Sequence, residues 1–230
     1  MTLQEAIKQR HSVRRYVHKP LSAEIVETLR KKIEECNAEG GLHIQLVTNE
    51  TRAFTGLFSY GKFSGVENYI VMVGKKADDL DERVGYYGEQ LVLLAQTLGL
   101  NTCWAGLSYR RVDEAYSVGD DEKLTCMIAL GYGATQGHKR KSKTAEQVSN
   151  VSSESPEWFR KGVEAVLMAP TAINQQKFSF TLLPNEQDTE DKPKVLAKRG
   201  FSMVGYTKMD IGIARLHFEI GAGKENFDWA

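Results

Sequence analysis

The same order of predicted elements occurs twice in the chain, and this repetition constrains the fold more than any other feature. Residues 24–100 and 158–223 each contain a predicted helix, two strands and an apolar helix with glycine. Leu42–Val47 would correspond to Phe178–Leu183. Mixed helices and strands in this order predict an α+β fold. The repetition fits an internal duplication, and it also fits the ordinary recurrence of helix–strand order in such folds.

Hydrophobic periodicity and turn residues give the individual elements. Helices are predicted over Thr2–Arg10, from Ser22 to near Cys36–Gly41, and over Asp81–Leu98, Arg110–Tyr116, Pro156–Met168 and Met209–Ile220. Strands are predicted over Leu42–Thr48, Asn68–Val73, Thr102–Gly106, Cys126–Leu130, Lys177–Leu183 and around Phe201–Tyr206. Glu50–Gly65 is expected to be a loop or a broken helix, Asn185–Lys194 is expected to be a loop, and the polar segment Ser142–Ser155 is the candidate linker.

Composition excludes several classes of protein. Lys+Arg and Asp+Glu both number 30, so bulk charge predicts neither a nucleic-acid nor a membrane partner, and any anion must be bound by a local cluster. Cys36, Cys103 and Cys126 lack CxxC spacing, which indicates neither disulfides nor a metal site. No apolar run is long enough to span a bilayer, and the N-terminus lacks the pattern of a signal peptide. We therefore expect a cytoplasmic protein.

The segment Arg10-His11-Ser12-Val13-Arg14-Arg15-Tyr16 begins where a helix is predicted to end. Arg10, Ser12 and Arg14 offer charge-assisted donors that suit a phosphate dianion. The alternative is a solvated basic patch that complements the helix dipole.

The segment Ala169-Pro170-Thr171-Ala172-Ile173-Asn174-Gln175-Gln176 lies between a helix and a strand. Pro170 should stop the helix. Thr171, Asn174 and Gln176 then present donors and acceptors, as the polar edge of a planar heterocycle requires. A polar helix–strand connection explains the same residues without a ligand.

Three further segments have two interpretations each. Gly99–Gly106 combines small residues with a tryptophan, which allows close approach to a ligand or simply a tight turn. His138–Lys143 carries five potentially cationic side chains, which suits a second phosphate clamp, a nucleic-acid patch or a solvated loop. Gly131-Tyr132-Gly133 with Gly137 imitates a dinucleotide-binding turn, but no apolar helix follows, so a Rossmann site is rejected.

Taken together, these segments resemble the FMN-dependent nitroreductase family. Arg10–Tyr16 resembles its phosphate motif, and Ala169–Gln176 resembles its Ala-Pro-Ser-x-x-Asn-x-Gln flavin-ring motif. Gly85–Gly106 resembles the central helix and the turn near flavin N5, and Leu130–Val148 resembles the closing segment, whose basic residues reach the flavin phosphate. The resemblance covers most of the chain and depends on the motifs jointly. It implies a nitroreductase-like mixed or antiparallel sheet flanked by helices.

The resemblance implies FMN as cofactor and assigns these residues to it: Arg10, His11, Ser12, Arg14, Lys62, Trp104, Ala105, Gly106, Arg140, Lys141, Lys143, Pro170, Thr171, Ala172, Asn174 and Gln176. The backbone of Ala105 or Gly106 would hydrogen-bond N5, and Lys62 would stabilise the reduced ring near N1 and O2. No side chain is assigned a catalytic role, and no metal is expected. The acceptor pocket would be lined by Phe54, Phe58, Tyr60 or Trp104.

One departure from the family pattern bears on assembly. The family's ring motif normally follows the second helix, where this chain has Glu35–Gly41 instead. Family members are typically homodimers that bind FMN at the interface, so the late motif suggests a fused pseudo-dimer. Residues 1–148 would form one half with the phosphate motif, and residues 149–230 a shortened second half with the ring motif. The chain would then be a monomeric pseudo-dimer or a homodimer. A helix pattern Asp-x-Gly-x-Ala-x-x-His-Phe-Glu at Asp210–Glu219 matches a divergent branch of the family.

The implied function is an FMN-dependent oxidoreductase that uses NADH or NADPH. FMN would take a hydride at N5 and pass electrons to a nitroaromatic, quinone or similar small molecule by a ping-pong mechanism. The alternative is a flavin-binding protein without turnover, which stores, senses or degrades flavin. A nucleic-acid function of His138–Lys143 is a third reading, and the balanced charge disfavours it.

Overall fold

The computed structural model describes residues 1–55, 62–138, 140–184 and 192–230, and the chain forms two compact units. Unit 1 contains Met1–Thr2, Gln9–Leu80 and Gln90–Lys139, and unit 2 contains Leu3–Lys8, Asp81–Glu89 and Arg140–Ala230. Helix α3 (Leu80–Thr97) contributes its first half to unit 2 and its second half to unit 1. The predicted division into halves 1–148 and 149–230, and their origin by duplication, stay predictions.

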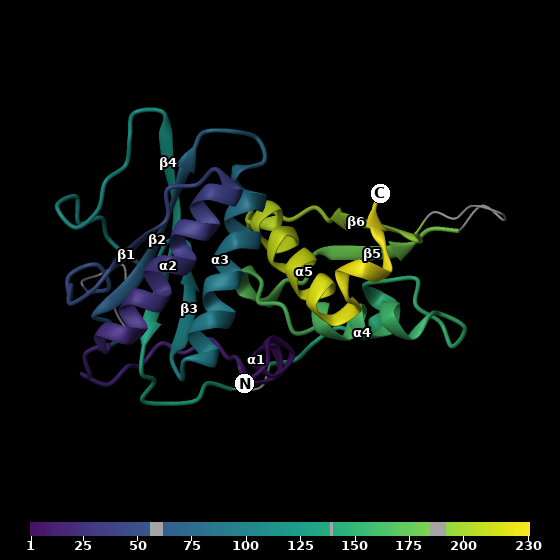
Figure 1. Cartoon of the computed structure of the whole chain (residues 1–230), viewed down its shortest axis with the longest axis horizontal. Coiled ribbons are helices and arrows are strands. Elements are labelled where there is room, and N and C mark those ends of the chain that lie inside the picture. Colours follow the sequence, from purple (N-terminus) through teal and green to yellow (C-terminus); the bar gives the residue numbers. More distant parts are fainter. Residues whose placement is uncertain (56–61, 139, 185–191) are drawn as a thin grey trace. The chain divides into compact units, whose positions relative to one another are not determined.

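Unit 1 is built on a four-stranded antiparallel sheet in the order β1-β2-β4-β3. The strands are β1 (Gln45–Val47), β2 (Asn68–Lys75), β3 (Asn101–Ala105) and β4 (Glu122–Gly131). Residues 68–74 of β2 are all buried, so this strand has side chains packed on both of its faces. Helix α2 (Ala23–Gly40) packs beside β1 and runs along the sheet (Figure 1).

The ends of α2 show why this segment is helical. Ser22 is the N-cap, and its hydroxyl accepts a hydrogen bond from Ile25 N at 3.3 Å. Gly41 ends the helix with φ of 57°, a left-handed conformation that glycine adopts without steric cost. The second half of α3 supplies fully buried side chains to unit 1, among them Leu91, Val92 and Leu93. The predicted central position of this helix is confirmed.

Unit 2 contains the mixed sheet β5-β6-β7. Strands β5 (Phe178–Leu182) and β6 (Lys194–Arg199) are antiparallel, and β7 (Asp228–Trp229) is parallel to β6. Helices α4 (Glu157–Val166) and α5 (Thr207–Ala222) pack against each other, and α5 lies beside β5 and β6 (Figure 1). The unit also contains most of α1 (Leu3–Gln9) and the 3-10 turns Ala145–Gln147, Ala172–Asn174 and Lys224–Asn226.

The core of unit 2 is aromatic. Phe180 of β5 stacks on Phe218 of α5, with ring centroids 5.1 Å apart and planes 7° from parallel. Phe218 also meets Phe159 of α4 and Phe227 edge to face. Such pairs contribute energy beyond the area that they bury. Elements from four parts of the sequence are therefore joined by one ring cluster.

The crossing of α3 and α5 within unit 2 depends on two glycines. A Cβ atom at Gly212 would lie 2.0 Å from Glu82 O, and one at Gly85 would lie 2.1 Å from Met209 O. Any larger residue at either position would collide with backbone, so the close approach of the two helices requires glycine at both positions.

Three expectations about local structure are wrong. Arg110–Tyr116 is a turn and not a helix, because Arg110 N donates to Ala53 O and holds the segment against another loop. The strand expected around Phe201–Tyr206 instead occupies Lys194–Arg199, since Gly205 and Tyr206 have φ of 79° and 62° and cannot continue a strand.

The third concerns the candidate linker, Ser142–Ser155, which is folded into unit 2. Val148 is fully buried, Ser149 forms a bridge with Phe180, and Asn150 exchanges hydrogen bonds with the backbone of Leu182. Part of the expected loop at Asn185–Lys194 lies outside the described residues, as do Phe58 and Tyr60.

Candidate functional site

The N-terminal motif extends the sheet of unit 1 beyond its edge strand β3. Ser12 bridges Thr102 in parallel orientation, and Val13 N donates to Thr102 O at 3.0 Å. Tyr16 N donates to Ser64 O at 3.0 Å. The Tyr16 hydroxyl donates to Val13 O at 2.6 Å and closes the segment on itself. Hydrogen bonds within the protein itself therefore hold the backbone of the motif.

Arg10, Ser12 and Arg14 gather around the thiol of Cys103 on β3. Burial raises the pKa of the Cys103 thiol, while the charges of Arg14 and Arg10 and a hydrogen bond with Ser12 partly oppose that rise. Arg10 is 8% exposed, Ser12 is half-buried and Arg14 is exposed. The structure thus brings together the three side chains that the sequence proposed for a phosphate. Two cations and a hydroxyl on a fixed backbone suit an anion.

The glycine-rich segment after β4 closes over the N-terminal motif. A Cβ atom at Gly137 would lie 2.6 Å from Cβ of His11. Gly133 N donates to Asn101 Oδ1 at 3.0 Å, and Val17 N donates to Tyr132 O at 2.9 Å. The strand pairs of this sheet are antiparallel, as expected after the rejection of a Rossmann turn. The glycines therefore allow close packing against the motif.

The other residues of unit 1 that were assigned to FMN do not form a cluster of this kind. Ala105 is buried at the end of β3, with Trp104 and Gly106 half-buried beside it. Lys62 is exposed in a turn. Phe54, expected in an acceptor pocket, is instead part of the core, where its ring lies 4.9 Å from that of Phe63.

The ring motif forms a strained loop in unit 2. Ala169 and Pro170 are buried after the end of α4, and a 3-10 turn follows at Ala172–Asn174. Ile173, Asn174 and Gln176 have φ of 46°, 59° and 44°. For a residue other than glycine, this left-handed backbone conformation costs about 1–2 kcal/mol. Three such residues in one short loop persist only because neighbouring groups hold them, and strain of this kind concentrates at functional sites.

Arg140 holds the loop from one side. Its guanidinium donates to Asn174 Oδ1 at 2.9 Å and to the carbonyl oxygens of Leu167 and Ala169 at 2.9 and 2.7 Å. Asn174 Nδ2 in turn donates to Lys141 O at 2.7 Å. Two predicted groups, the basic segment and the ring motif, therefore contact each other directly.

Gln176 is held by the same basic segment. Its Oε1 accepts from Lys143 N at 2.9 Å, and its Nε2 donates to Ser142 Oγ at 3.0 Å and Leu167 O at 3.2 Å. The ammonium of Lys143 donates to Gln176 O at 2.6 Å, and burial lowers the pKa of Lys143.

The side-chain amides of Asn174 and Gln176 differ in their capacity to bind a ligand. Gln176 is 2% exposed, and both of its N–H groups are used. Asn174 is half-buried, and with the bonds of the described residues counted it retains one N–H and one acceptor position. Asn174 therefore fits the polar edge of a ring in this conformation, whereas Gln176 fits a structural role.

Asp210 of α5 holds the loop from the other side, and the sequence did not assign it to the site. Its Oδ1 accepts from Ala172 N at 3.0 Å, and its Oδ2 accepts from Gln175 Nε2 at 2.7 Å. Asp210 is 3% exposed, and burial raises its pKa to about 6, while these two hydrogen bonds oppose the rise. The position of Asp210 in the Asp210–Glu219 pattern was the only sequence signal for it.

The remaining polar residues of that pattern stabilise unit 2. His217 Nε2 lies 2.9 Å from Glu89 Oε1, and its Nδ1 lies 3.1 Å from Ala165 O, all in the buried interior. Glu219 accepts from the Tyr86 hydroxyl at 2.6 Å and from Trp229 Nε1 at 2.8 Å. The pattern therefore describes how α5 joins α3, α4 and the ring-motif loop.

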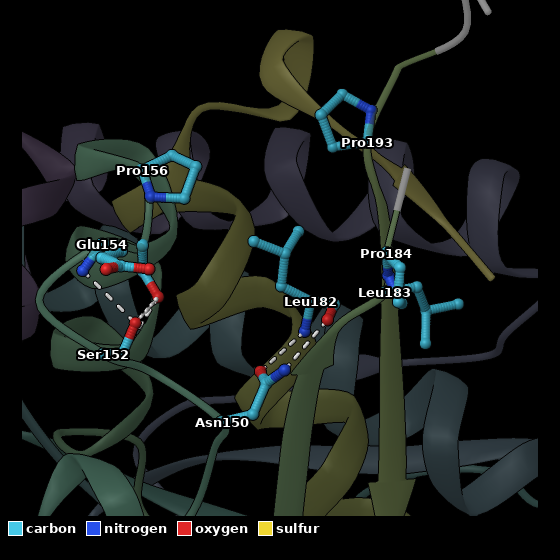
Figure 2. Close-up of a pocket in the computed structure, with 9 residues that line it drawn as sticks. Asn150, Ser152, Glu154, Pro156, Leu182, Leu183, Pro184 and Pro193 are labelled. Carbon is cyan, nitrogen blue, oxygen red and sulfur yellow. Dashed lines mark hydrogen bonds between the residues drawn. The ribbon is translucent and has the colours of Figure 1, made fainter. Parts of the chain in front are cut away.

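Unit 2 also has an open hollow with a volume of about 420 Å³, next to the start of α4 (Figure 2). Asn150 and Leu182 exchange two hydrogen bonds of 2.9 Å at its wall. Among the lining residues that the structure describes, Glu154 is the one ionisable side chain, and none of the described site residues lines the hollow. This hollow therefore offers little chemistry.

The fold defines the class of protein. A protein from Thermotoga maritima MSB8, described as a putative nitroreductase, has a TM-score of 0.62 and 23% identity, over 98% of this chain and 85% of its own. A putative nitroreductase from a Desulfovibrio desulfuricans subspecies, solved in complex with FMN, has a TM-score of 0.51 and 18% identity, over 68% and 98%. A protein from Parabacteroides distasonis, described as a putative NADH dehydrogenase/NAD(P)H nitroreductase, has a TM-score of 0.51 and 19% identity, over 64% and 95%. The chain thus has the α+β nitroreductase fold.

The family follows from the sequence. The model of the family described as "Putative TM nitroreductase" matches residues 2–222, and the chain belongs to this family. The predicted nitroreductase family and the predicted α+β fold are confirmed. A search of curated proteins found no match. Within the described residues, no helix is long and apolar enough to cross a membrane, and no group of three or more potential metal ligands occurs.

Proposed function

We propose that this chain is an FMN-dependent oxidoreductase that takes electrons from NADH or NADPH and delivers them to a small-molecule acceptor. The observation that carries the proposal is the convergence of Arg10, Ser12 and Arg14 around Cys103 on a hydrogen-bonded backbone. Membership of a nitroreductase family and the FMN-bound structure of the Desulfovibrio protein support it. The name of the Parabacteroides protein supports a nicotinamide donor.

The donor set fits FMN in its chemistry. Arg10, Ser12 and Arg14 of unit 1 would hold the phosphate, where guanidinium groups make paired hydrogen bonds to phosphate oxygens. Within unit 2, Asn174 of the ring-motif loop can still donate and accept, which is what the polar edge of a flavin ring requires. When bound, FMN would supply the two-electron chemistry. Arg140 and Lys143, expected at the phosphate, already donate to the loop, so we propose that they orient Asn174.

Flavin binding tests the phosphate site directly. In the variant with both Arg10→Ala and Arg14→Ala, we expect FMN affinity to fall by at least tenfold, since a hydrogen bond to a charged group contributes roughly 1.5–3 kcal/mol. Arg30→Ala is the matched control, because Arg30 is an exposed cation on α2 of the same unit. Equal FMN affinity in the double variant and the control would rule out the phosphate role.

Turnover needs a separate measurement. Bleaching of bound flavin by NADH or NADPH without oxygen, followed by reoxidation with an added acceptor, is the expected result. A flavin that binds but is not reduced would instead indicate storage, sensing or degradation of flavin. The three cysteines are free and buried, which suits the reducing cytoplasm that we propose as location.

A further inference from the structure

The loop Thr171–Gln176 needs support from outside because its own backbone is strained. Its positive φ angles at Ile173, Asn174 and Gln176 cost energy that contacts with neighbouring segments must offset. Arg140 supports Asn174, at the end of the 3-10 turn. The beginning of the turn, at Ala172, is supported by Asp210 instead.

We propose that Asp210 is the positioning residue of the ring-motif loop: its carboxylate holds Ala172 and Gln175 and so keeps Asn174 in its ligand-ready conformation. The expected effect of Asp210 on FMN binding depends on the proposed function, whereas its effect on the conformation of the loop does not. Asp210 would act through this loop and not as a catalytic residue.

Each carboxylate oxygen of Asp210 accepts a hydrogen bond from a different residue of the loop. Oδ1 accepts from Ala172 N at 3.0 Å and fixes the start of the turn. Oδ2 accepts from Gln175 Nε2 at 2.7 Å, and the same Nε2 donates to Gly205 O at 3.0 Å. Asp210 and Gln175 therefore join the ring-motif loop to the Gly200–Gly205 loop. Only an ionised carboxylate accepts both bonds without carrying a hydrogen of its own.

The surroundings of Asp210 make this arrangement sensitive to pH. The loop that faces Asp210 has no ionisable side chain between Ala169 and Gln176. Among the described residues, α5 carries Lys208 two positions before Asp210, and α3, which crosses α5 at Gly85 and Gly212, carries Glu82 and Arg83, with Glu82 paired to Arg215. Tyr206 contributes its backbone oxygen to Asp210 N. Burial raises the Asp210 pKa, and the hydrogen bonds from Ala172 and Gln175, both uncharged, oppose that rise.

The buried side-chain amide of Gln175 can accept a hydrogen bond from Asp210 when Asp210 is protonated. Its Oε1 is buried and has no hydrogen-bond partner among the described residues. When Asp210 binds a proton, rotation of the amide would let Oε1 accept the new O–H. The bond from Nε2 to Gly205 O would then be lost. Protonation therefore exchanges one hydrogen-bond pattern for another and separates the two loops.

The test uses the full-length protein with and without FMN. In the flavin-free protein, amide exchange of the peptide that contains Ala172 should be at least tenfold faster in Asp210→Ala than in the wild type. Asp210→Asn should restore most of the protection, because an amide oxygen can still accept from Ala172 N. Glu219→Gln is the matched control: it removes a buried charge from the same helix, away from the loop.

FMN affinity provides the second readout. Wild-type affinity should fall about tenfold between pH 8 and pH 5, one unit below the pKa of Asp210. The phosphate of FMN titrates near the same pH, so the relevant quantity is the difference between wild type and Asp210→Asn. Asp210→Asn should show the weaker pH dependence.

Two outcomes would overturn the proposal. One is equal exchange at Ala172 in Asp210→Ala and Glu219→Gln. The other is an identical pH profile of FMN affinity in wild type and Asp210→Asn. Should Asp210→Ala fail to fold, Gln175→Met replaces it, since this variant removes the link to Asp210 and Gly205 alone. A wild type that binds no FMN would refute the proposed function, and the exchange experiment would still decide the role of Asp210.

Discussion

The guanidinium of Arg140 donates a hydrogen bond of 2.9 Å to the side-chain oxygen of Asn174. The same group donates to the carbonyl oxygens of Leu167 and Ala169, just after α4 ends. A cation at this end of a helix also complements the helix dipole. One side chain therefore closes α4 and orients the ring motif.

We expect Arg140→Ala to lower the free energy of unfolding by about 2–4 kcal/mol, because several charged hydrogen bonds are lost together. Arg140→Lys should recover less than half of this loss, since an ammonium cannot reproduce the planar fork. Urea unfolding measures both values. Lys141→Ala, at the exposed neighbouring position, is the control and should change stability little. An equally stable Arg140→Ala protein would contradict the structural role.

Stability should depend on pH through Asp210. Its pKa is raised from 3.8 to about 6 in the folded protein, so folding takes up a proton between these values. The stabilisation is fully present below pH 4 and is lost as pH rises through 6, by up to about 3 kcal/mol. Asp210→Asn should therefore gain stability relative to wild type as pH rises from 4 to 8. A constant difference across this range, measured by denaturant unfolding, would be inconsistent with the buried carboxylate.

His217 and Glu89 should behave as a coupled pair. Removing His217 alone, as His217→Leu, should cost about 3–5 kcal/mol because Glu89 stays buried without this partner. Replacing both residues by Leu should recover at least half of that loss. A double-mutant cycle by thermal or urea unfolding gives the coupling energy. Additive effects would show that the 2.9 Å contact contributes nothing to stability.

Gly212→Ala should destabilise unit 2, because the added Cβ would lie 2.0 Å from the backbone oxygen of Glu82. We expect a loss of about 2 kcal/mol or more, at the upper end of overpacking effects. Gly200→Ala is the control within unit 2, since its nearest atom would be 3.3 Å away. Equal melting temperatures for the two variants would contradict the close crossing of α3 and α5.

Assembly is tested by mass and flavin content together. The pseudo-dimer proposal predicts a monomer in solution that binds one FMN. Native mass spectrometry or light scattering with an absorbance spectrum measures both quantities. An obligate homodimer with two FMN molecules, each lost when Asn174 of the other chain is replaced by Ala, would refute the fused arrangement.

The sequence by itself determined most of the elements and both candidate motifs. The spacing of apolar residues gave α2, α3 and α5, because a periodic apolar face is a local property that burial requires wherever the helix packs. Ser22 and Gly41 marked the ends of α2 for the same local reason. The prediction of a strand around Phe201–Tyr206 was wrong because the left-handed conformation of Tyr206 cannot be read from the amino-acid composition of the segment.

Only the tertiary structure decided which polar groups act on one another. Arg140 and Asn174 are 34 positions apart, and Asp210 and Ala172 are 38 apart, so no local spacing relates them. The sequence assigned Gln176 and Arg140 separately to a flavin, and only the folded chain shows that Arg140 donates to Asn174 and that Gln176 is bonded to Ser142 and Lys143. Hydrogen bonds between distant side chains depend on the path of the backbone, and packing around the aromatic core of unit 2 fixes that path.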